Sequence, residues 1–296
     1  MTGSRPLSRR AFVRDGALLL GGLAGHSLLA VDRAQEPAFR IGLVTDLHYA
    51  DKPKNGSRYY RETLEKLEEA VTVFNNERPA FVVELGDLID KAETVEQELA
   101  WLDAVERVYS RTKAKRHYVL GNHCVDTLTK SEFATHTGAA KTPHYSFDHA
   151  GSHFVVLDAC YRSDGEPYGR KNSDWQDANI PPSQLEWLQA DLAKSSLPVM
   201  VFAHQRLDAS GQHSVRNAEA VRTILEKSGR TLAVFQGHSH KNDYQQIRGI
   251  HYVTLVAMIE GSGMSNSGYC LLEVMSDQSL HLRGFRQQVN RTLLKV

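Results

Sequence analysis

Short apolar runs alternate with amphipathic patterns along the first half of this chain, and this alternation limits the folds that it can adopt. Runs at 39–45, 80–86 and 116–121 are separated by patterns with a helical period at 61–75 and 95–109. Each run has the length of a strand, and each intervening pattern has the length of a helix. A repeat of strand, helix and strand at this spacing predicts parallel strands joined by right-handed crossovers.

The second half of the chain adds antiparallel features. Runs at 144–150 and 152–159 are separated by Gly151, which predicts a hairpin, and the tail from Tyr244 alternates apolar and polar residues like antiparallel strands. Further helical patterns and buried runs lie at 181–195, 215–229, 198–204 and 232–238. We therefore predict a mixed α/β sandwich in which helices flank two sheets.

A polar loop of the kind that is usually functional or mobile covers about 160–180. Its basic and aromatic residues could hold a phosphorylated substrate at the edge of a cleft, and the alternative is a solvated lid. These residues are Arg162, Tyr168, Arg170, Lys171 and Trp175.

Polar side chains that can donate to a metal ion follow five of the predicted strands, at the point where each strand ends. They are Asp46 and His48, then Asp87 with Asp90, then Asn122 and His123, then His204, and finally His238 and His240. Because ligands bind at the carboxyl ends of strands in open α/β sheets, we expect these side chains to share one site. Carboxylates, imidazoles and an amide oxygen are good donors for hard or borderline metal ions.

The number of donors favours two metal ions over one. A catalytic ion takes about three or four protein ligands and keeps positions open for water and substrate. Seven candidate ligands out of these nine side chains are too many for one such ion, but they suffice for two ions about 3.5–4 Å apart that share one carboxylate. The shared ligand must be anionic to hold two cations close together, so it is Asp46 or Asp87.

The order of these motifs resembles that of the calcineurin-like metallophosphoesterase family. D-x-H, G-D-x-x-D, G-N-H, a single H and G-H-x-H follow one another between about Arg40 and His251. Each motif alone is weak, whereas all five in order, each at a strand end, are specific. The resemblance implies an α/β fold of the metallo-dependent phosphatase type, a four-layer α/β/β/α sandwich with two mixed β-sheets flanked by helices. It also implies a single metallophosphoesterase domain over residues 36–296.

The resemblance further implies a role for each candidate residue. Asp87 bridges two divalent metal ions, which are manganese, iron or zinc. One ion is bound by Asp46, His48, Asp87 and His240, and the other by Asp87, Asn122, His204 and His238. Metal-bound hydroxide then hydrolyses a phosphoric ester or anhydride. His123 is a catalytic residue that stabilises phosphoryl charge or protonates the leaving oxygen, and Asp90 orients it and keeps its pKa high.

Other stretches resemble the manganese-dependent ADP-ribose/CDP-alcohol diphosphatase branch of the family. They are "HYADKPKNGSRYYRETLEKLEEAV", "ELGDLID", "QLEWLQADL" and "GIHYVTLVAMIE". We expect Arg58 to bind a second phosphate, Tyr59 or Tyr60 to stack on a base or bind a sugar, and Arg206 to contact the cleft beside His204. The alternative is that the two tyrosines belong to the core and that the arginine is solvated.

Departures from that branch keep other functions open. The branch carries glutamine at His48 and glutamate at Cys124, and glycines follow its last motif where this chain has "HKND". One alternative is an exported phosphomonoesterase or phosphodiesterase, either alkaline-phosphatase-like or specific for cyclic nucleotides. A second is a non-catalytic, metal-binding exported protein, and a third is a cysteine hydrolase that uses Cys124 with His123.

The first 35 residues have a different character from the rest of the chain. Ser8-Arg9-Arg10-Ala11-Phe12, followed by an apolar stretch at 16–30, resembles a twin-arginine export signal. The apolar stretch is too short and too broken for a stable membrane span. Residues 1–35 are therefore expected to be an export signal and linker that engages the twin-arginine machinery, which places the protein in the periplasm or outside the cell.

Charge and cysteine content narrow the partners. The formal net charge is zero and no long basic run is present, so a nucleic-acid partner is not expected. The expected partner is a small-molecule phosphate ester or a nucleotide. An odd and small number of cysteines, Cys124, Cys160 and Cys270, argues against a disulfide framework.

Overall fold

The computed structural model describes residues 13–14, 17–18 and 36–294. The chain forms two compact units, Met1–Gln35 and Glu36–Val296. In the first unit, two short strands, β1 (Val13–Arg14) and β2 (Ala17–Leu18), pair antiparallel. The rest of the predicted export signal, including the arginine pair, lies outside the described residues.

The larger unit contains two six-stranded sheets, of which the first has the order β14-β13-β12-β3-β4-β5. Its strands are β3 (Phe39–Val44), β4 (Phe81–Glu84), β5 (Lys115–Tyr118), β12 (Gly268–Val274), β13 (Leu280–Arg286) and β14 (Arg291–Leu293). β3, β4 and β5 are parallel, as their alternation with helices predicts. The three strands from the tail extend this sheet antiparallel to one another and to β3.

The second sheet has the order β10-β11-β9-β8-β7-β6. Its strands are β6 (Tyr145–His149), β7 (Ser152–Val156), β8 (Val199–Phe202), β9 (Thr231–Gln236), β10 (Asp243–Ile247) and β11 (Ile250–Thr254). β6 and β7 form the predicted hairpin. The expectation of an antiparallel tail is wrong for β11 on one side, because this strand pairs in parallel with β9.

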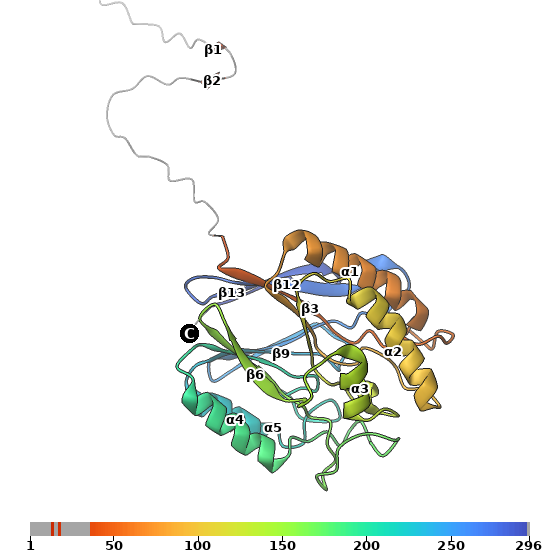
Figure 1. Ribbon diagram of the computed structural model, residues 1–296. Coiled ribbons are helices and arrows are strands. Elements are labelled where there is room, and N and C mark those ends of the chain that lie inside the picture. Colours follow the sequence, from red (N-terminus) through yellow and green to blue (C-terminus); the bar gives the residue numbers. More distant parts are fainter. Residues whose placement is uncertain (1–12, 15–16, 19–35, 295–296) are drawn as a thin grey trace, which may run out of the picture. The chain divides into compact units, whose positions relative to one another are not determined.

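Helices cover the outer faces of both sheets (Figure 1). They are α1 (Thr63–Glu77), α2 (Val95–Tyr109), α3 (Lys130–Thr137), α4 (Pro182–Lys194) and α5 (Ala218–Ser228), with short 3-10 helices η1 (Tyr60–Glu62), η2 (His123–Val125) and η3 (Met264–Asn266). α2 spans the predicted 95–109 and begins after Thr94, whose hydroxyl accepts a hydrogen bond from the Gln97 N–H. The predicted four-layer α/β/β/α architecture is confirmed.

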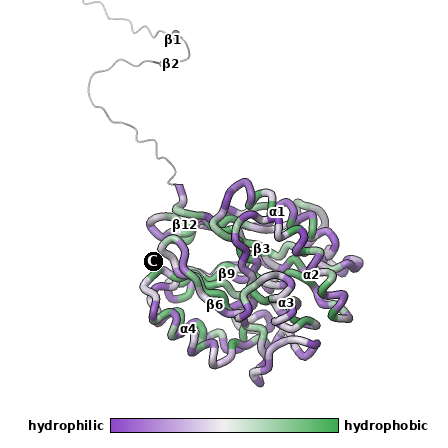
Figure 2. The backbone as a smooth tube through the Cα atoms, viewed as in Figure 1, coloured by the Kyte–Doolittle hydropathy of each residue, from purple (hydrophilic) through white to green (hydrophobic). Residues whose placement is uncertain are grey.

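Three apolar layers separate the four layers of backbone. α1 and α2 pack on the first sheet through side chains such as Phe74 and Leu102. The two sheets face each other through Phe81 and Phe202, and α5 packs on the second sheet through Leu225. Because the central strands are buried on both faces, they are continuous apolar runs in the sequence. The outer helices alternate between hydrophobic and hydrophilic stretches (Figure 2).

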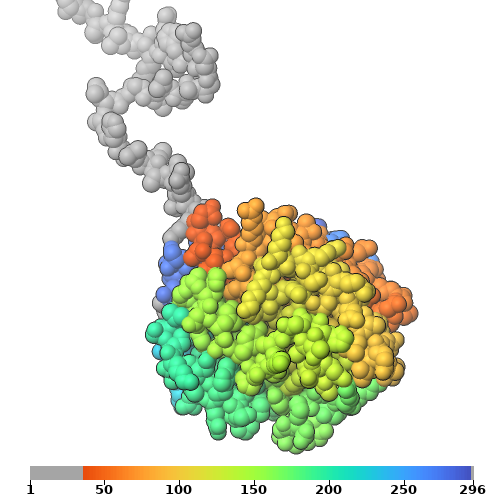
Figure 3. Space-filling model, viewed as in Figure 1, coloured from red at the N-terminus to blue at the C-terminus, as the bar shows by residue number. Residues whose placement is uncertain are grey.

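Some elements carry too weak a sequence signal to be predicted. α3 has only eight residues and buries only two of them, Phe133 and Thr137, and the edge strand β10 is largely polar. Between β7 and α4 the chain forms no helix or strand beyond an isolated bridge from Tyr161 to Pro167, as expected for the polar loop. The yellow, green and teal segments that contain α2 to α4 cover most of the face in Figure 3. Among the described residues, no helix is long and apolar enough to cross a membrane.

Candidate metal centre

The seven predicted metal ligands lie at the carboxyl ends of strands from both sheets. They follow β3 (Asp46, His48), β4 (Asp87), β5 (Asn122), β8 (His204) and β9 (His238, His240). Six of the seven are buried and His240 is partly buried. The fold therefore brings together strand ends that are far apart in the sequence, and it removes their polar side chains from water.

Potential ligand atoms from these residues, together with those of Asp90 and His123, form neighbouring clusters in the described part of the chain, each with its atoms within 4.8 Å of one another. The clusters are Asp46, His48 and His240; Asp87, His204 and His238; and His48, Asp90 and His123. We call the first the Asp46 half-site, and we call the second, with Asn122, the His204 half-site. Asp87 lies between them, because its Oδ2 is 3.5 Å from His48 Nε2 and 3.1 Å from His204 Nε2.

The backbone of the two half-sites is unusual. Asp46, His48, Asp87, His238 and His240 all have positive φ angles, between 46° and 69°. Non-glycine residues adopt this left-handed conformation at a cost of roughly 1–3 kcal/mol each, and such strain gathers at functional sites. Five strained residues that all offer ligand atoms to one place indicate a site held in shape by the surrounding fold.

The glycines of the motifs allow the strand ends to approach closely. A Cβ atom on Gly121 would collide with the backbone nitrogen and the carboxylate of Asp87, and one on Gly86 would collide with the His204 ring. A Cβ on Gly237 would collide with the Asp46 carboxylate. The glycine before each of these ligand motifs is therefore required by contact between ligand-bearing loops, and not only by turn geometry.

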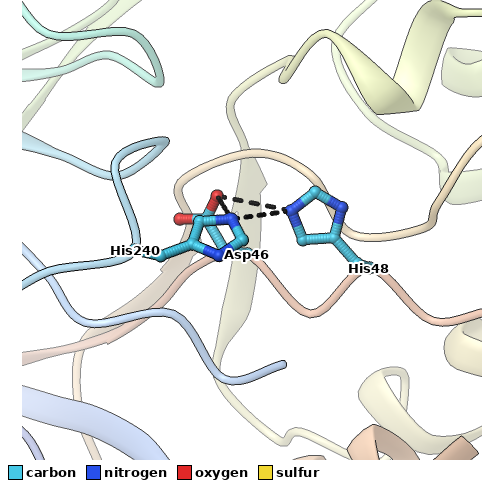
Figure 4. Close-up of side chains that lie close together, drawn as sticks. All are labelled: Asp46, His48 and His240. Carbon is cyan, nitrogen blue, oxygen red and sulfur yellow. Dashed lines mark hydrogen bonds and ion pairs between the residues drawn. The ribbon is translucent and has the colours of Figure 1, made fainter. Parts of the chain in front are cut away.

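In the Asp46 half-site, the two imidazoles point at each other and at the carboxylate (Figure 4). His48 Nε2 lies 3.1 Å from His240 Nε2, and these two atoms lie 3.6 and 3.4 Å from Asp46 Oδ1. Two neutral imidazole nitrogens with facing lone pairs repel each other unless a proton or a cation lies between them. The Nδ1 of His240 is 2.6 Å from Glu260 Oε1, which directs Nε2 toward the half-site.

The His204 half-site has the same convergence with a different support. His238 Nδ1 lies 3.1 Å from His204 Nε2. The Nδ1–H of His204 donates to the carbonyl of Leu85 at 2.8 Å, which leaves the Nε2 lone pair free. The Oδ1 of Asn122 is buried and has no hydrogen-bond partner among the described residues. An unpaired buried acceptor is costly, and coordination of a cation would satisfy it.

The ionisation of these groups fits two divalent cations. Burial lowers the pKa of His48 to about 4 and that of His238 well below its usual range, so both imidazoles keep a lone pair at neutral pH. Burial raises the pKa of Asp87, but His204, His123 and His48 outweigh it and hold that pKa below its usual range. Although burial lowers the pKa of His240, contacts with Asp46 and Glu260 raise it to about 9. A divalent cation replaces such a proton when it binds.

The predicted catalytic pair lies beside the Asp46 half-site. His123 Nδ1 is 2.6 Å from Asp90 Oδ1, and the rings of His123 and His48 meet edge to face with centroids 4.6 Å apart. Burial lowers the pKa of His123, but the charge of Asp87 and the close contact with the Asp90 carboxylate outweigh it, so the pKa is raised. Lys52, which no motif marks, binds Asp90 Oδ2 at 2.6 Å and therefore shares this carboxylate with His123.

The four predicted substrate residues fall into two groups. Arg58 is partly buried, and its positive charge partly opposes the rise in the pKa of His123 and of His240. Among the described residues, no carboxylate forms an ion pair with Arg58. Tyr59 is partly exposed as well. Tyr60 packs in the core at 4% exposure, and Arg206 is bound to Asp208 and Asp243. These placements favour Arg58 and Tyr59 over Tyr60 and Arg206 as substrate contacts.

The polar loop contributes one aromatic residue to the site. Trp175 is 36% exposed, and its ring centroid lies 5.7 Å from that of His238. The basic residues Arg162, Arg170 and Lys171 of the same loop are held in ion pairs with carboxylates. The other aromatic residue considered, Tyr168, is buried. Of the loop residues that could hold a substrate, the structure therefore favours Trp175.

Cys124 does not have the environment of a nucleophile. Its side chain is fully buried, its Sγ accepts a hydrogen bond from the Leu88 N–H at 3.3 Å, and burial raises the pKa of its thiol. Reactive cysteines have a lowered pKa and partial exposure, so this geometry opposes the cysteine-hydrolase alternative. Cys160 and Cys270 are also buried and unbridged.

Comparison with known proteins agrees with this geometry. The profile of the family described as calcineurin-like phosphoesterase matches residues 39–242. The chain is similar to the manganese-dependent ADP-ribose/CDP-alcohol diphosphatases of Oryza sativa (26% identity, 83% of this chain, 91% of that protein) and Homo sapiens (30%, 78% and 86%). Its fold is similar to the crystal structure of a dimetal phosphatase from Danio rerio, with a TM-score of 0.79 and 23% identity over 88% of this chain and 100% of that one.

Proposed function

This chain belongs to the calcineurin-like phosphoesterase family and is a phosphoester hydrolase, and from that premise we propose that it is a manganese-dependent diphosphatase. Its proposed substrates are nucleoside diphosphates linked to a sugar or an alcohol, of the ADP-ribose or CDP-alcohol type. The observation that carries the proposal is the pair of half-sites that share Asp87, in a chain that spans most of two diphosphatases of that name.

The residues of the site have different roles in the proposed hydrolysis. Two divalent cations in the half-sites would supply Lewis acidity and make a water molecule acidic near neutral pH. His123 holds Asp90 through Nδ1, which leaves Nε2 as the atom that donates a proton to the leaving oxygen. Asp90, ionised and also bound to Lys52, keeps the imidazole oriented and protonated. Burial of the half-sites excludes bulk water and strengthens these electrostatic interactions.

Two features near the metal centre support a substrate with two phosphates and a base. Arg58 forms no ion pair with a carboxylate among the described residues, although its side chain hydrogen-bonds that of Tyr60, so we expect its positive charge to bind the phosphate that does not react. Trp175 exposes an aromatic ring beside His238, on the other half-site. A planar base would gain stacking energy there.

The experiment that tests the proposal compares substrates on the purified chain reconstituted with Mn²⁺, with a chelator control. The panel contains ADP-ribose, CDP-choline, p-nitrophenyl phosphate, bis-p-nitrophenyl phosphate and cyclic AMP. We expect preferred cleavage of the two pyrophosphate-linked compounds into two monophosphates each. Preference for the simple monoester would contradict the proposal and favour the exported phosphatase. No chelator-sensitive hydrolysis at all would favour a non-catalytic metal-binding protein.

We also propose that the protein is exported through its N-terminal twin-arginine sequence. The support is Ser8-Arg9-Arg10-Ala11-Phe12 followed by a short apolar stretch. Cell fractionation of the full chain tests this, with Arg9→Lys and Arg10→Lys together as the variant. We expect the variant to stay in the cytoplasm, and equal export of both forms would exclude the twin-arginine route.

A further inference from the structure

The segment of residues 258–261, which follows β11, joins several parts of the molecule next to the Asp46 half-site. The backbone N–H groups of Met258 and Ile259 donate to the carbonyls of Thr45 and Asp46 at 3.2 and 3.0 Å. Its other side forms backbone hydrogen bonds with the loop that precedes η1. The segment is therefore fastened directly to the strand end that carries a predicted metal ligand.

A buried lysine holds this segment in place from α1. Lys66 is fully buried, and its Nζ donates to the carbonyls of Met258, Glu260 and Gly261 at 2.9, 3.0 and 2.8 Å. An ammonium group has three donors, and all three are used on one short stretch of backbone. A fully buried lysine that binds carbonyls in place of a carboxylate is rare, so this arrangement points to a requirement for a fixed segment and not to general packing.

The segment carries one side chain that reaches a predicted metal ligand. Glu260 accepts a hydrogen bond from His240 Nδ1 at 2.6 Å, and the Ser57 side chain also binds this carboxylate. A carboxylate behind a ligating histidine fixes the tautomer and the orientation of the ring and makes its other nitrogen a stronger donor. In the other half-site a neutral backbone carbonyl, that of Leu85, does the corresponding work for His204.

We propose that Glu260 and Lys66 are positioning residues for the metal ion of the Asp46 half-site. Glu260 sets the orientation and donor strength of His240, and Lys66 fixes the backbone from which Glu260 projects. The inference rests on the dinuclear centre of the proposed function. It does not depend on which phosphate compound is the substrate, because its test is metal binding.

The test is a calorimetric titration of the full chain with Mn²⁺ after removal of metal by a chelator. The chain with its native residues is expected to bind two ions. Glu260→Gln keeps the size of the side chain and removes its charge, so we expect one of the two ions to bind about 10–100-fold more weakly, the usual effect of losing such a partner. The other ion is expected to bind with unchanged affinity.

A second variant identifies the ion that is affected. Asn122→Ala removes a ligand of the His204 half-site only, so the Asp46 half-site is intact in that background. Adding Glu260→Gln to Asn122→Ala is expected to weaken the remaining tight ion by the same factor. If Glu260→Gln leaves both affinities unchanged, or weakens only the ion that Asn122→Ala also weakens, the proposal is wrong.

Glu62→Gln is the matched control, because Glu62 binds Ser262 and Gly263, directly after the segment, and makes no recorded contact with His240. This variant also removes a carboxylate whose charge acts on Lys66, so it tests the support of the segment without the contact to His240. Equal weakening by Glu62→Gln would show general loosening of the loop and overturn the role of Glu260. Lys66→Met is expected to weaken the same ion as Glu260→Gln. If Lys66→Met does not fold, as judged by circular dichroism, the Glu260 variants still decide the question. If none of these chains, including the native one, hydrolyses any phosphate ester, the metal titration remains interpretable.

Discussion

The two half-sites have similar donors but are held in place in different ways. His204 is fixed by the carbonyl of Leu85, at the end of β4, so its partner is part of the sheet framework. His240 is fixed by the side chain of Glu260, which lies on an irregular segment fastened by Lys66. One half-site therefore has its histidine held by a backbone carbonyl, which a side-chain substitution at Leu85 does not remove. The other depends on two side chains, which a single substitution can remove.

The largest effect on metal binding and on hydrolysis is expected from a substitution of Asp87, because this residue belongs to both half-sites. Asp87→Asn keeps the shape of the side chain but removes the negative charge that lies 3.5 Å from His48 Nε2 and 3.1 Å from His204 Nε2. Titration with Mn²⁺ is expected to show weaker binding of both ions. The rate of hydrolysis is expected to fall by more than about 10–100-fold, which is the usual effect of losing a residue that hydrogen-bonds a metal ligand. Unchanged binding of either ion would mean that Asp87 serves one half-site only.

Substitution of His123, which lies outside both half-sites, is expected to leave Mn²⁺ binding unchanged and to lower the rate of hydrolysis strongly. His123→Ala removes the imidazole bound to Asp90 at 2.6 Å, and no predicted ligand is lost. We expect kcat to fall about 10²–10⁴-fold, the range for loss of an acid catalyst, with both Mn²⁺ ions bound as before. The fall is expected to be greatest for substrates with poorly acidic leaving groups. Loss of an ion in this variant would place His123 among the ligands instead.

Substitution of Arg58 tests whether a residue beside the Asp46 half-site binds the second phosphate of the substrate. Arg58→Ala is expected to lower kcat/KM for ADP-ribose about 10–100-fold, because a charge-assisted hydrogen bond of about 1.5–3 kcal/mol is lost. The same variant is expected to change kcat/KM for p-nitrophenyl phosphate by much less, because that substrate has no second phosphate. Arg61→Ala is the control, because Arg61 is exposed and is bound to Asp51. Equal losses on both substrates would assign Arg58 to the reacting phosphate.

The sequence predicts the metal ligands that follow strands, but it does not predict the side chains that support His240. Strand ends with Asp46, Asp87 and His204 could be located because β-strands and the residues after them leave a strong local pattern. Glu260 and Lys66 could not, because their partners lie 20 and 192 residues away and the contacts are made by a side chain and by irregular backbone. Short-range periodicity carries no information about such contacts.

The smallest effect is expected from a buried carboxyl that belongs to neither half-site. Glu98, on α2, is fully buried, and burial raises its pKa to about 7. Its pKa in the unfolded chain is about 4.3, so the folded state binds more protons between these values and its stability falls as pH rises. Glu98→Gln removes this dependence. The free energy of unfolding of the parent and of the variant is measured with urea at pH 5 and at pH 8. Relative to the parent, the variant is expected to be about 2 kcal/mol more stable at pH 8 than it is at pH 5.

Glu96→Gln, at an exposed position of the same helix, is the control for the loss of a carboxylate from α2. A shift of the same size with this variant would contradict the assignment of the pH dependence to the buried Glu98. Neither Glu96 nor Glu98 contacts a predicted ligand, so Mn²⁺ binding by both variants at a fixed pH should match that of the parent chain. A change in metal affinity with Glu98→Gln would show that the packing of α2 supports the half-sites in addition to the two supports described above.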